Sequence, residues 1–320
     1  MKKTRPSLLA LLLLVPLVLF VTEFVIYFPF TYRTLDRAGR TKLVKGPDEL
    51  AVTITGDIML GDRADSFLRE KGWVYPFAAT RHLLQASDLV IGNLEGPLTR
   101  RGRRDTTRTW AYRVDPDSVR GLAAAGFHAM ALANNHIRDC GDEGVVDSVL
   151  HLSNAGIAAL GGGADTNGAH RPLLRTIRGV RIAVFSYLAP YVYLGGGRHY
   201  FSYAQFAAAP GRAGGALGTL ANVRRDIARI RKDADVVIAI FHSGDRYERQ
   251  PKPEFVRYMR AVLDLGTDAV VCHGTHIAGP VEVWRGKPLL HGVGNYAFGS
   301  QNINANFSLL ATLFIDVKGK

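Results

Sequence analysis

The stretch AMALANNHIRD, residues 129–139, decides how this chain is interpreted. A short apolar run in it leads directly into Asn134, Asn135 and His136, and an apolar run bounded by polar residues is typical of a buried strand. In an open α/β sheet, ligands bind at the carboxyl ends of the strands. The stretch therefore predicts a strand that carries chemically useful side chains at its carboxyl end.

Four further segments share this design, because each is an apolar run that stops at side chains able to bind a metal ion. They are VTITGD with Asp57, DLVIGNLE with Glu95, DVVIAIFH with His242, and DAVVCHGTH with His273 and His276. Any one of these side chains could be an ordinary turn, cap or loop residue. Five strand ends that all carry oxygen or imidazole donors favour one site built from the whole chain.

The composition is that of a folded protein with a basic surface. The 320 residues are 47% hydrophobic and 21% charged, which excludes a disordered or fibrous protein. Lys and Arg number 40 against 28 Asp and Glu, and the formal net charge of +12 favours an acidic partner such as an anionic polymer or lipid. The sequence carries no recognisable nucleic-acid-binding motif, so we expect no nucleic acid partner.

Residues 8–30 are almost continuously apolar, with Glu23 as their only charge. This length suffices to cross a bilayer as a helix, and no A-x-A-like cleavage site follows it. We therefore expect residues 1–30 to be a single-pass anchor in the cell membrane, with a cleaved secretory signal as the alternative. Basic residues on both sides leave the orientation open from charge alone. Both interpretations place the rest of the chain outside the cytoplasm.

Residues 31–49 are polar and basic and are expected to be a linker, followed by one domain over residues 50–320. In the first half, strands expected at 50–55, 88–92, 129–133 and 157–160 alternate with helices expected at 65–71, 115–126 and 142–155. In the second half, we expect hairpins over 173–186 and 281–292, strands at 236–241, 269–272 and 308–317, and helices at 217–232 and 253–265. This order predicts an α/β fold with mixed sheets.

Two long segments show no periodicity. Residues 97–110 contain the basic cluster Arg100, Arg101, Arg103, Arg104 and Arg108, which is either a solvated run of charge or a rim that gathers an anionic substrate. Residues 187–215 are rich in Gly, Tyr and Ala and are too long for an ordinary connection, which suggests a lid or binding loop.

The donors at the strand ends form a set that Mn, Zn or Fe ions accept together. The candidate ligands are Asp57, Glu95, Asn135, His242, His273 and His276. One or two divalent ions could bind, with Glu95 as the bridge, and two ions can hold both the attacking and the leaving oxygen of a displacement. His136 could protonate a leaving group, and Asp139 could orient its imidazole by accepting the other N–H.

At these residues the chain resembles the bacterial capsule-biosynthesis CapA family, associated with poly-γ-glutamate capsules, within the calcineurin-like metallophosphatase superfamily. The resemblance covers roughly residues 50–298 and is carried by TGDIMLGDR (55–63), DLVIGNLEGPLT (88–99), ALANNHIRDCG (131–141), HSGDRYERQP (242–251), CHGTH (272–276) and GVGNYAFG (292–299). It implies a four-layer α/β/β/α sandwich with the six ligands named above and His136 as the catalytic acid. It also implies Arg63 as an anion contact and Asn295 as a support of the site.

The chain departs from the pattern of the wider superfamily at one place, which CapA-like proteins share, and from the pattern of CapA-like proteins at another. The wider superfamily has Asp-x-His in its first motif, whereas this chain has Asp57, Ile58 and Met59. Because a thioether is a poor ligand for a hard ion, a site with a single metal also fits. CapA-like proteins usually carry Trp and then an acidic residue after the His of the fourth motif, whereas Ser243 and Arg246 stand here. The details of the substrate pocket therefore do not carry over.

We expect a membrane-anchored, extracytoplasmic CapA-like protein that binds a divalent metal and an anionic polymer such as poly-γ-glutamate, with capsule synthase subunits as further partners. Export, assembly and hydrolysis of the polymer all remain open. The alternatives are a general metallophosphoesterase acting on a nucleotide or lipid phosphate, and a non-enzymatic scaffold of a polymer synthase. Cys140 and Cys272 each lie beside a site motif, and either a disulfide or two buried thiols would fit.

Overall fold

The computed structural model describes residues 42–194, 199–243, 246–299, 305 and 308–318. Residues 47–320 form one compact unit, separate from residues 1–46, and the description below concerns the larger unit. The anchor expected over residues 1–30 lies outside the described residues, as does most of the expected linker. In the part of the chain that the structure describes, no helix has both the length and the apolar character needed to cross a membrane.

The first sheet has six strands and is mostly parallel, in the order β15-β1-β2-β3-β4. Its strands are β1 (Glu49–Met59), β2 (Leu89–Leu94), β3 (Ala129–Ala131), β4 (Ala158–Leu160), β15 (Asn295–Phe298) and β16 (Ala311–Asp316). The long β1 pairs with β16 in antiparallel fashion along its first half and with β15 in parallel fashion at its end. All strands that lead into the predicted site motifs of the first half therefore point the same way.

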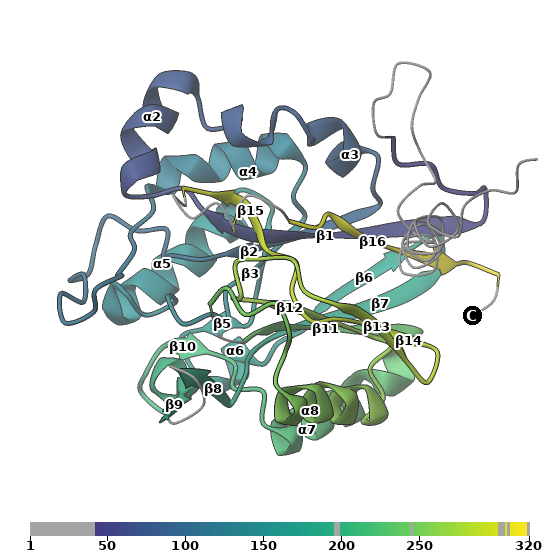
Figure 1. The fold of residues 1–320 in the computed structure, drawn as a ribbon. Coiled ribbons are helices and arrows are strands. Elements are labelled where there is room, and N and C mark those ends of the chain that lie inside the picture. The colour runs from purple at the N-terminus through teal and green to yellow at the C-terminus, as the bar shows by residue number, and fades with distance from the viewer. Residues whose placement is uncertain (1–41, 195–198, 244–245, 300–304, 306–307, 319–320) are drawn as a thin grey trace, which may run out of the picture. The chain divides into compact units, whose positions relative to one another are not determined.

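Helices from the first half of the chain cover the outer face of this sheet (Figure 1). They are α2 (Arg63–Lys71), η1 (Tyr75–Phe77), α3 (Arg81–Gln85), η2 (Pro116–Ser118), α4 (Val119–Ala125) and α5 (Gly141–Asn154). The Asp115 carboxylate accepts a hydrogen bond from the Asp117 amide and caps η2, and Gly126 ends α4 at a φ of 101°. The helix predicted from Asp115 to Gly126 is thus a 3₁₀ turn that continues as α4.

The second sheet also has six strands, in the order β13-β14-β12-β11-β7-β6. Its members are β6 (Leu173–Ile177), β7 (Val180–Leu188), β11 (Val236–His242), β12 (Ala269–His273), β13 (Val281–Trp284) and β14 (Lys287–Leu290). The four inner strands are parallel, and the hairpin partners β6 and β13 form antiparallel edges. On its outer face lie α7 (Leu220–Ile230), η4 (Arg231–Asp233) and α8 (Pro253–Asp264), seen at the bottom of Figure 1.

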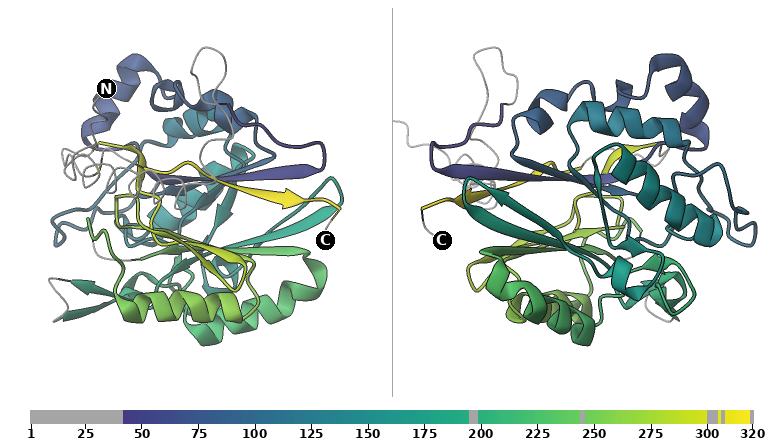
Figure 2. Two further views of the ribbon diagram at one scale, coloured as in Figure 1. Left: turned by 45° about the vertical axis from the view of Figure 1, so that its right-hand side comes forward. Right: turned by 180° about the vertical axis from the view of Figure 1, so that it is seen from behind.

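The two sheets pack face to face, with helices outside both of them (Figures 1 and 2). The apolar side chains between them alternate along the strands, as in Val52 and Ile54 of β1 and Ile238 and Ile240 of β11. The opposite faces of both sheets contribute to a second apolar cluster with the helices. The expectation of an α/β fold with mixed sheets is confirmed, and the layers run helix, sheet, sheet, helix.

The segment over residues 187–215 contains regular structure, which sequence periodicity did not reveal. The hairpin of β8 (Tyr191–Leu194) and β9 (His199–Ser202) is followed by η3 (Tyr203–Phe206), and β10 (Gly214–Gly215) pairs with β5 (Gly162–Gly163) next to α6 (Thr166–Ala169). Phe206 and Tyr203 are buried, so the second half of this segment packs into the body of the protein. Its predicted role as a lid stays a prediction.

The strand predicted to end before Asp57 continues to Met59, which corrects the prediction that Asp57 ends a strand. Gly56 explains the difference, because a Cβ there would lie 2.2 Å from the carbonyl oxygen of Gly294. The bare backbone lets the two chains approach, and the Asp57 amide donates to that oxygen over 2.8 Å. The pairing then carries β1 past Asp57 along β15, a strand that the sequence did not predict.

The second hairpin is also shifted from its prediction. Its second strand, β14, spans Lys287–Leu290 rather than residues 289–292, because the turn consists of Arg285 and Gly286 alone. Their φ angles of 50° and 80° are those of a two-residue turn that matches the twist of the strands.

We expect Val184→Ala to lower the free energy of unfolding by about 2 kcal/mol, because Val184 is fully buried between the sheets and its removal leaves a cavity. Val283→Ala is the matched control, since Val283 is 61% exposed on the edge strand β13 and should change stability by less than about 0.5 kcal/mol. Urea unfolding of a protein that starts at residue 45 measures both. Equal effects of the two substitutions would contradict the layer arrangement.

Candidate metal-binding site

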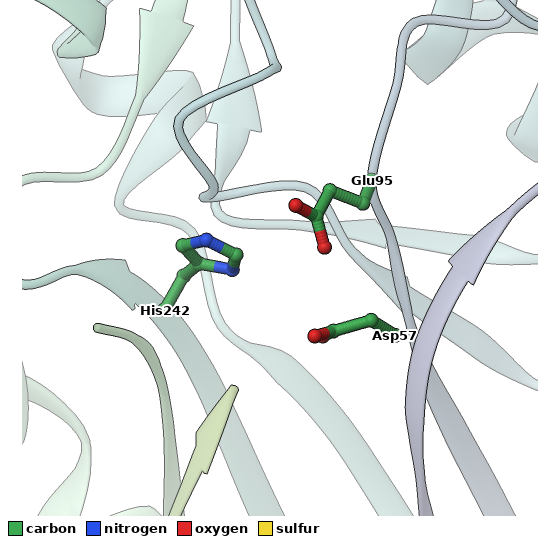
Figure 3. A group of neighbouring side chains, drawn as sticks. All are labelled: Asp57, Glu95 and His242. Atoms are coloured by element: carbon green, nitrogen blue, oxygen red, sulfur yellow. The ribbon is translucent and has the colours of Figure 1, made fainter. Parts of the chain in front are cut away.

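Three of the predicted ligands meet between the carboxyl ends of the two sheets. Asp57 comes from β1, Glu95 directly follows β2, and His242 ends β11. One ligand atom of each lies within 4.8 Å of the others, all three side chains are buried, and they point toward a common space (Figure 3). The two sheets thus bring two carboxylates and an imidazole together from positions far apart in the sequence.

His276 lies against both carboxylates. Its Nδ1 is 3.2 Å from Asp57 Oδ2 and 2.9 Å from Asn295 Oδ1, and its Nε2 is 3.6 Å from Glu95 Oε1. Asn295 reaches this position because the register of β15 sets it beside Asp57. The backbone of His276 has a φ of 58°, a conformation that costs free energy in a non-glycine residue and is found at functional sites.

His273 and Asn135 also lie at this end of the sheets, and each keeps one buried acceptor atom without a partner among the described residues. His273 Nε2 donates to the Thr55 carbonyl over 2.8 Å, which leaves Nδ1 as the acceptor. Among the described residues, the buried atoms without partners include three acceptors of the predicted ligands, namely Glu95 Oε2, Asn135 Oδ1 and His273 Nδ1. Buried polar atoms are almost always satisfied in folded proteins, so three such acceptors at one end of the sheets fit a site that takes up a cation.

Burial governs the charges at this site. It raises the pKa of Glu95 to about 8, against the opposing charge of His276, and it lowers the pKa of His242 to about 3. Burial also disfavours the charged form of Asp57, but the hydrogen bond from His276 and the charges of the neighbouring histidines together outweigh it and lower the pKa of that carboxyl well below its ordinary range.

His276 responds in the opposite way to the same surroundings. Burial alone would lower its pKa, but Glu95 and Asp57 raise it to about 10. The positive form of His276 therefore compensates the negative charge that the two carboxylates bring into the site. A divalent cation could take the place of this positive charge, and metal binding would then be coupled to proton release.

The predicted acid His136 lies on the edge of the cluster and is held by Asp139. Its Nδ1 is 2.6 Å from Asp139 Oδ2, and its Nε2 is 3.6 Å from Glu95 Oε1. Burial lowers the pKa of His136, and the hydrogen bond with Asp139 opposes this effect. The Tyr112 amide donates to the same Asp139 oxygen over 2.6 Å, and the Tyr112 ring packs on the imidazole with 4.2 Å between ring centres.

Sequence reasoning missed two residues that organise this site. Asn93 donates through Nδ2 to Asp57 Oδ1 over 2.8 Å, and its side chain is buried. The signal was present, since Asn93 stands two residues before Glu95 in a strand and such residues share a face. Arg108 forms an ion pair with Asp139 and donates to the backbone oxygen of Asn135 over 2.9 Å.

The basic cluster of residues 97–110 is mostly neutralised within the protein. Arg100 pairs with Asp115 and Asp117, Arg101 with Asp147, Arg104 with Asp62 and Arg108 with Asp139. The side chains of Arg100, Arg101 and Arg104 are also exposed, so the cluster is a solvated run of charge whose arginines pair with aspartates. The alternative, a rim that gathers an anionic substrate, stays a prediction.

The remaining sequence candidates have defined places as well. Arg63, at the start of α2, and Asn295 line a pocket of about 280 Å³ beside the cluster. The sulfur of Met59 accepts a hydrogen bond from the Gly61 amide over 3.3 Å. Cys140 and Cys272 are both free and buried, which agrees with two buried thiols.

Curated relatives of the chain are named for polymer and capsule synthesis. A "Probable polyglutamine synthesis accessory protein" of Mycobacterium tuberculosis is 28% identical, with 83% of this chain and 79% of that protein covered. A "PGA biosynthesis protein CapA" of Bacillus subtilis is 26% identical over 86% of this chain and 70% of its own length. A "Capsule biosynthesis protein CapA" of Bacillus anthracis is 25% identical, with coverages of 78% and 60%.

Solved structures are more distant. A putative 5'-nucleotidase from Staphylococcus aureus, in complex with alpha-ketoglutarate, has a TM-score of 0.49 at 10% identity and covers 78% of this chain and 49% of its own. A hypothetical protein from Thermus thermophilus has a TM-score of 0.44 at 16% identity, with coverages of 77% and 76%. Both TM-scores lie below 0.5, so neither likeness bears on the function.

The sequence model of one family, described as "Bacterial capsule synthesis protein PGA_cap", matches residues 51–300. The match includes every strand end that supplies the cluster and extends to the edge of the pocket beside it. The chain therefore belongs to the PGA_cap family of bacterial capsule synthesis proteins.

Proposed function

We propose that this member of the capsule synthesis family is an extracytoplasmic, membrane-anchored protein that binds a divalent metal ion and acts on an anionic polymer of the poly-γ-glutamate type. The observation that carries the proposal is the buried meeting of Asp57, Glu95 and His242 within 4.8 Å. Relatives named for PGA biosynthesis and polyglutamine synthesis support the polymer. The net charge of +12 suits a polyanion.

The donor set fits a divalent ion. Asp57, Glu95 and His242 would hold it, and Asn135, His273 and His276 have donor atoms at the same end of the sheets. The neutral form of His242 is the form that binds metals, and its lowered pKa keeps it in that form. When bound, the ion would act as a Lewis acid and would make a water molecule more acidic. The Met59 sulfur already accepts a hydrogen bond from the Gly61 amide, which favours the binding of one ion over two.

His136 supplies the proton chemistry in this proposal. Its Nε2 faces the cluster, while Asp139 accepts the hydrogen bond from Nδ1 and fixes the orientation of the ring. In cleavage of an amide or ester, Nε2 would give its proton to the leaving nitrogen or oxygen, and Asp139 would stabilise the ring in its protonated form. The ion pair with Arg108 keeps the Asp139 carboxylate in place.

A non-enzymatic role in polymer synthesis is the second candidate. Met59 favours this role, because it stands where a second metal ion would need a ligand. Its thioether is a poor ligand and accepts a hydrogen bond from the Gly61 amide. In that case the cluster with its bound metal would stabilise the fold, and the polymer would bind without cleavage. The two candidates agree on metal and polymer binding and differ in the need for His136.

Metal binding should depend on His242 and Asn135. We expect His242→Ala and Asn135→Ala each to lower the metal content of the purified protein at least about 10-fold, because each removes a donor from a small buried set. His151→Ala, at a partly exposed position of α5, is the control and should leave the metal content unchanged. Elemental analysis after exposure to Mn, Zn or Fe measures it. Unchanged metal content in both site variants would remove the metal from the proposal.

Cleavage should depend on His136. With γ-linked glutamate oligomers as substrate, we expect His136→Gln to reduce turnover about 100-fold or more while the metal content is retained, which is the range for a general acid. A strain that carries this substitution should lose capsule at a normal protein level. Normal capsule in that strain would instead favour the non-enzymatic role, and turnover of an aryl phosphate alone would point to a general phosphoesterase.

Anchoring should depend on the apolar residues 8–30. We expect the full-length protein to stay with the membrane fraction after alkaline carbonate extraction, whereas a secreted form that starts at residue 45 should be released. An N-terminal sequence of the cellular protein that begins after residue 30 would show a cleaved signal and refute the anchor.

A further inference from the structure

A pocket connects the candidate site with the surface. It has a volume of about 280 Å³, and its walls include Arg63, Trp110, Tyr112, Arg246, Tyr247 and Phe298. His276 and Asn295 also line it, and His276 contacts both Asp57 and Glu95. A molecule in this pocket would therefore lie directly beside the cluster.

The backbone around the pocket is held in unusual conformations. In the described ranges, the non-glycine residues with positive φ are Asp62, Arg178, Tyr247, His276 and Arg285. Arg178 and Arg285 lie in the turns of the two hairpins. Asp62, Tyr247 and His276 all line this pocket. Strained residues of this kind persist only where the surrounding structure fixes them, and they gather at functional sites. The strain marks the pocket independently of the metal donors.

Positive charge dominates the wall of the pocket. Arg63 begins α2 and Arg246 follows β11, and both side chains are exposed. The acidic residue of the wall, Asp62, already forms an ion pair with Arg104. Arg246 lies over the Tyr247 ring, with 5.4 Å from the guanidinium carbon to the ring centre, which orients it at the wall.

Neutral aromatic side chains form half of the remaining wall, with Trp110, Tyr112, Tyr247 and Phe298. Burial raises the pKa of Tyr112 well above its ordinary value, whereas the charge of Arg246 acts in the opposite direction. The phenol therefore stays neutral and can act as a hydrogen-bond donor. Tyr112 also packs on His136, so the pocket wall and the predicted acid are in direct contact.

We propose that Arg63 and Arg246 form a clamp that binds the free carboxylate of one substrate unit. The clamp would select a polymer in which this carboxylate lies next to the amide bond that faces the cluster of Asp57, Glu95 and His242. This inference rests on the proposed function and names the substrate class more closely. Arginine recognises carboxylates through two parallel N–H donors, which gives geometric selectivity as well as affinity. The volume is small for a binding pocket, which suits a single unit of a polymer.

A clamp of this kind would distinguish between the two linkages of a glutamate chain. In a γ-linked glutamate chain, the free carboxylate is bonded to the carbon that carries the amide nitrogen. In an α-linked chain of the same charge, the carboxylate lies at the end of a flexible side chain and farther from the amide. A clamp beside the cluster therefore favours the γ-linked chain, because it can hold the carboxylate and present the adjacent amide together.

Binding of short oligomers to the full-length protein in detergent tests the clamp. The probes are γ-linked and α-linked glutamate pentamers and inorganic phosphate, and binding is followed by calorimetry and by the fluorescence of Trp110 in the pocket wall. We expect the γ-linked pentamer to bind at least about 10-fold more tightly than the α-linked one. Arg63→Ala and Arg246→Ala should each weaken γ-pentamer binding about 10-fold, the effect of losing one charge-assisted contact.

Arg103→Ala is the matched control, because it removes the same charge from an exposed arginine that is not part of the pocket. It should change the γ-pentamer affinity less than about 2-fold, as expected for a screened surface charge. Arg246→Lys, which keeps the charge and loses the paired donors, should recover only part of the affinity. Thermal unfolding of every variant verifies that the fold is intact.

Equal weakening by all three alanine substitutions would overturn the clamp, because general charge attraction would then explain the binding. Equal affinity for the two pentamers would contradict the preference for the γ-linked chain. Competition by phosphate at the same concentration would contradict selective recognition of a carboxylate. If the γ-pentamer binds and the clamp variants behave like the wild type, this inference fails and the proposed function stands. If neither pentamer binds to a protein loaded with metal, the polymer named in the proposed function is wrong.

Discussion

The burial of two carboxylates in one small space is the constraint on which the rest of this structure depends. Asp57 and Glu95 are 0% and 1% exposed, and moving charged groups out of water is among the most unfavourable steps in folding. His276 offsets part of this cost, because the two carboxylates raise its pKa to about 10, and burial raises the pKa of Glu95 to about 8. The compensation is incomplete, because Glu95 Oε2 remains without a hydrogen-bond donor among the described residues. In the proposed function, a bound cation would supply the missing charge and would explain why the fold retains an arrangement that is poor for its own stability.

The two-sheet architecture holds this arrangement rigid. Each sheet ends at the site with parallel strands, and the alternating apolar core between the sheets fixes their separation. At the closest points the chain uses residues without side chains. Gly56 admits the backbone of Gly294, and a Cβ on Gly274 would lie 2.9 Å from His242 Nε2. Hence β1, β15 and the loop after β12 can meet with no space for side chains between them, and this brings donors from both sheets within reach of one cation.

The strand ends were predictable because two local signals coincide in each of them. An apolar run followed by a donor such as Glu95 or His242 identifies a strand and the end at which it carries chemistry, and a parallel sheet gathers such ends. Neighbouring residues without this pattern gave no such signal. The four residues of β15 are too short to show a period, and their pairing with β1 depends on a close contact at Gly56. Arg108 lies in an irregular loop, and its contact with Asp139 follows from the path of the folded chain, which spacing alone does not predict.

The distribution of positive charge shows why net charge and binding are separate questions. A formal charge of +12 predicts an anionic partner, and the arginine-rich loop of residues 97–110 is its most prominent source in the sequence. In the folded protein, four of those arginines pair with aspartates, and Arg108 serves the site by fixing Asp139. These pairs partly neutralise the charge of the loop, although Arg100, Arg101 and Arg104 remain exposed. Arg63 and Arg246, which are isolated in the sequence, lie in the pocket beside the cluster. In our proposal, recognition of an anion therefore rests on two arginines that line one pocket in the fold, and the arginines of the dense cluster are not part of that pocket.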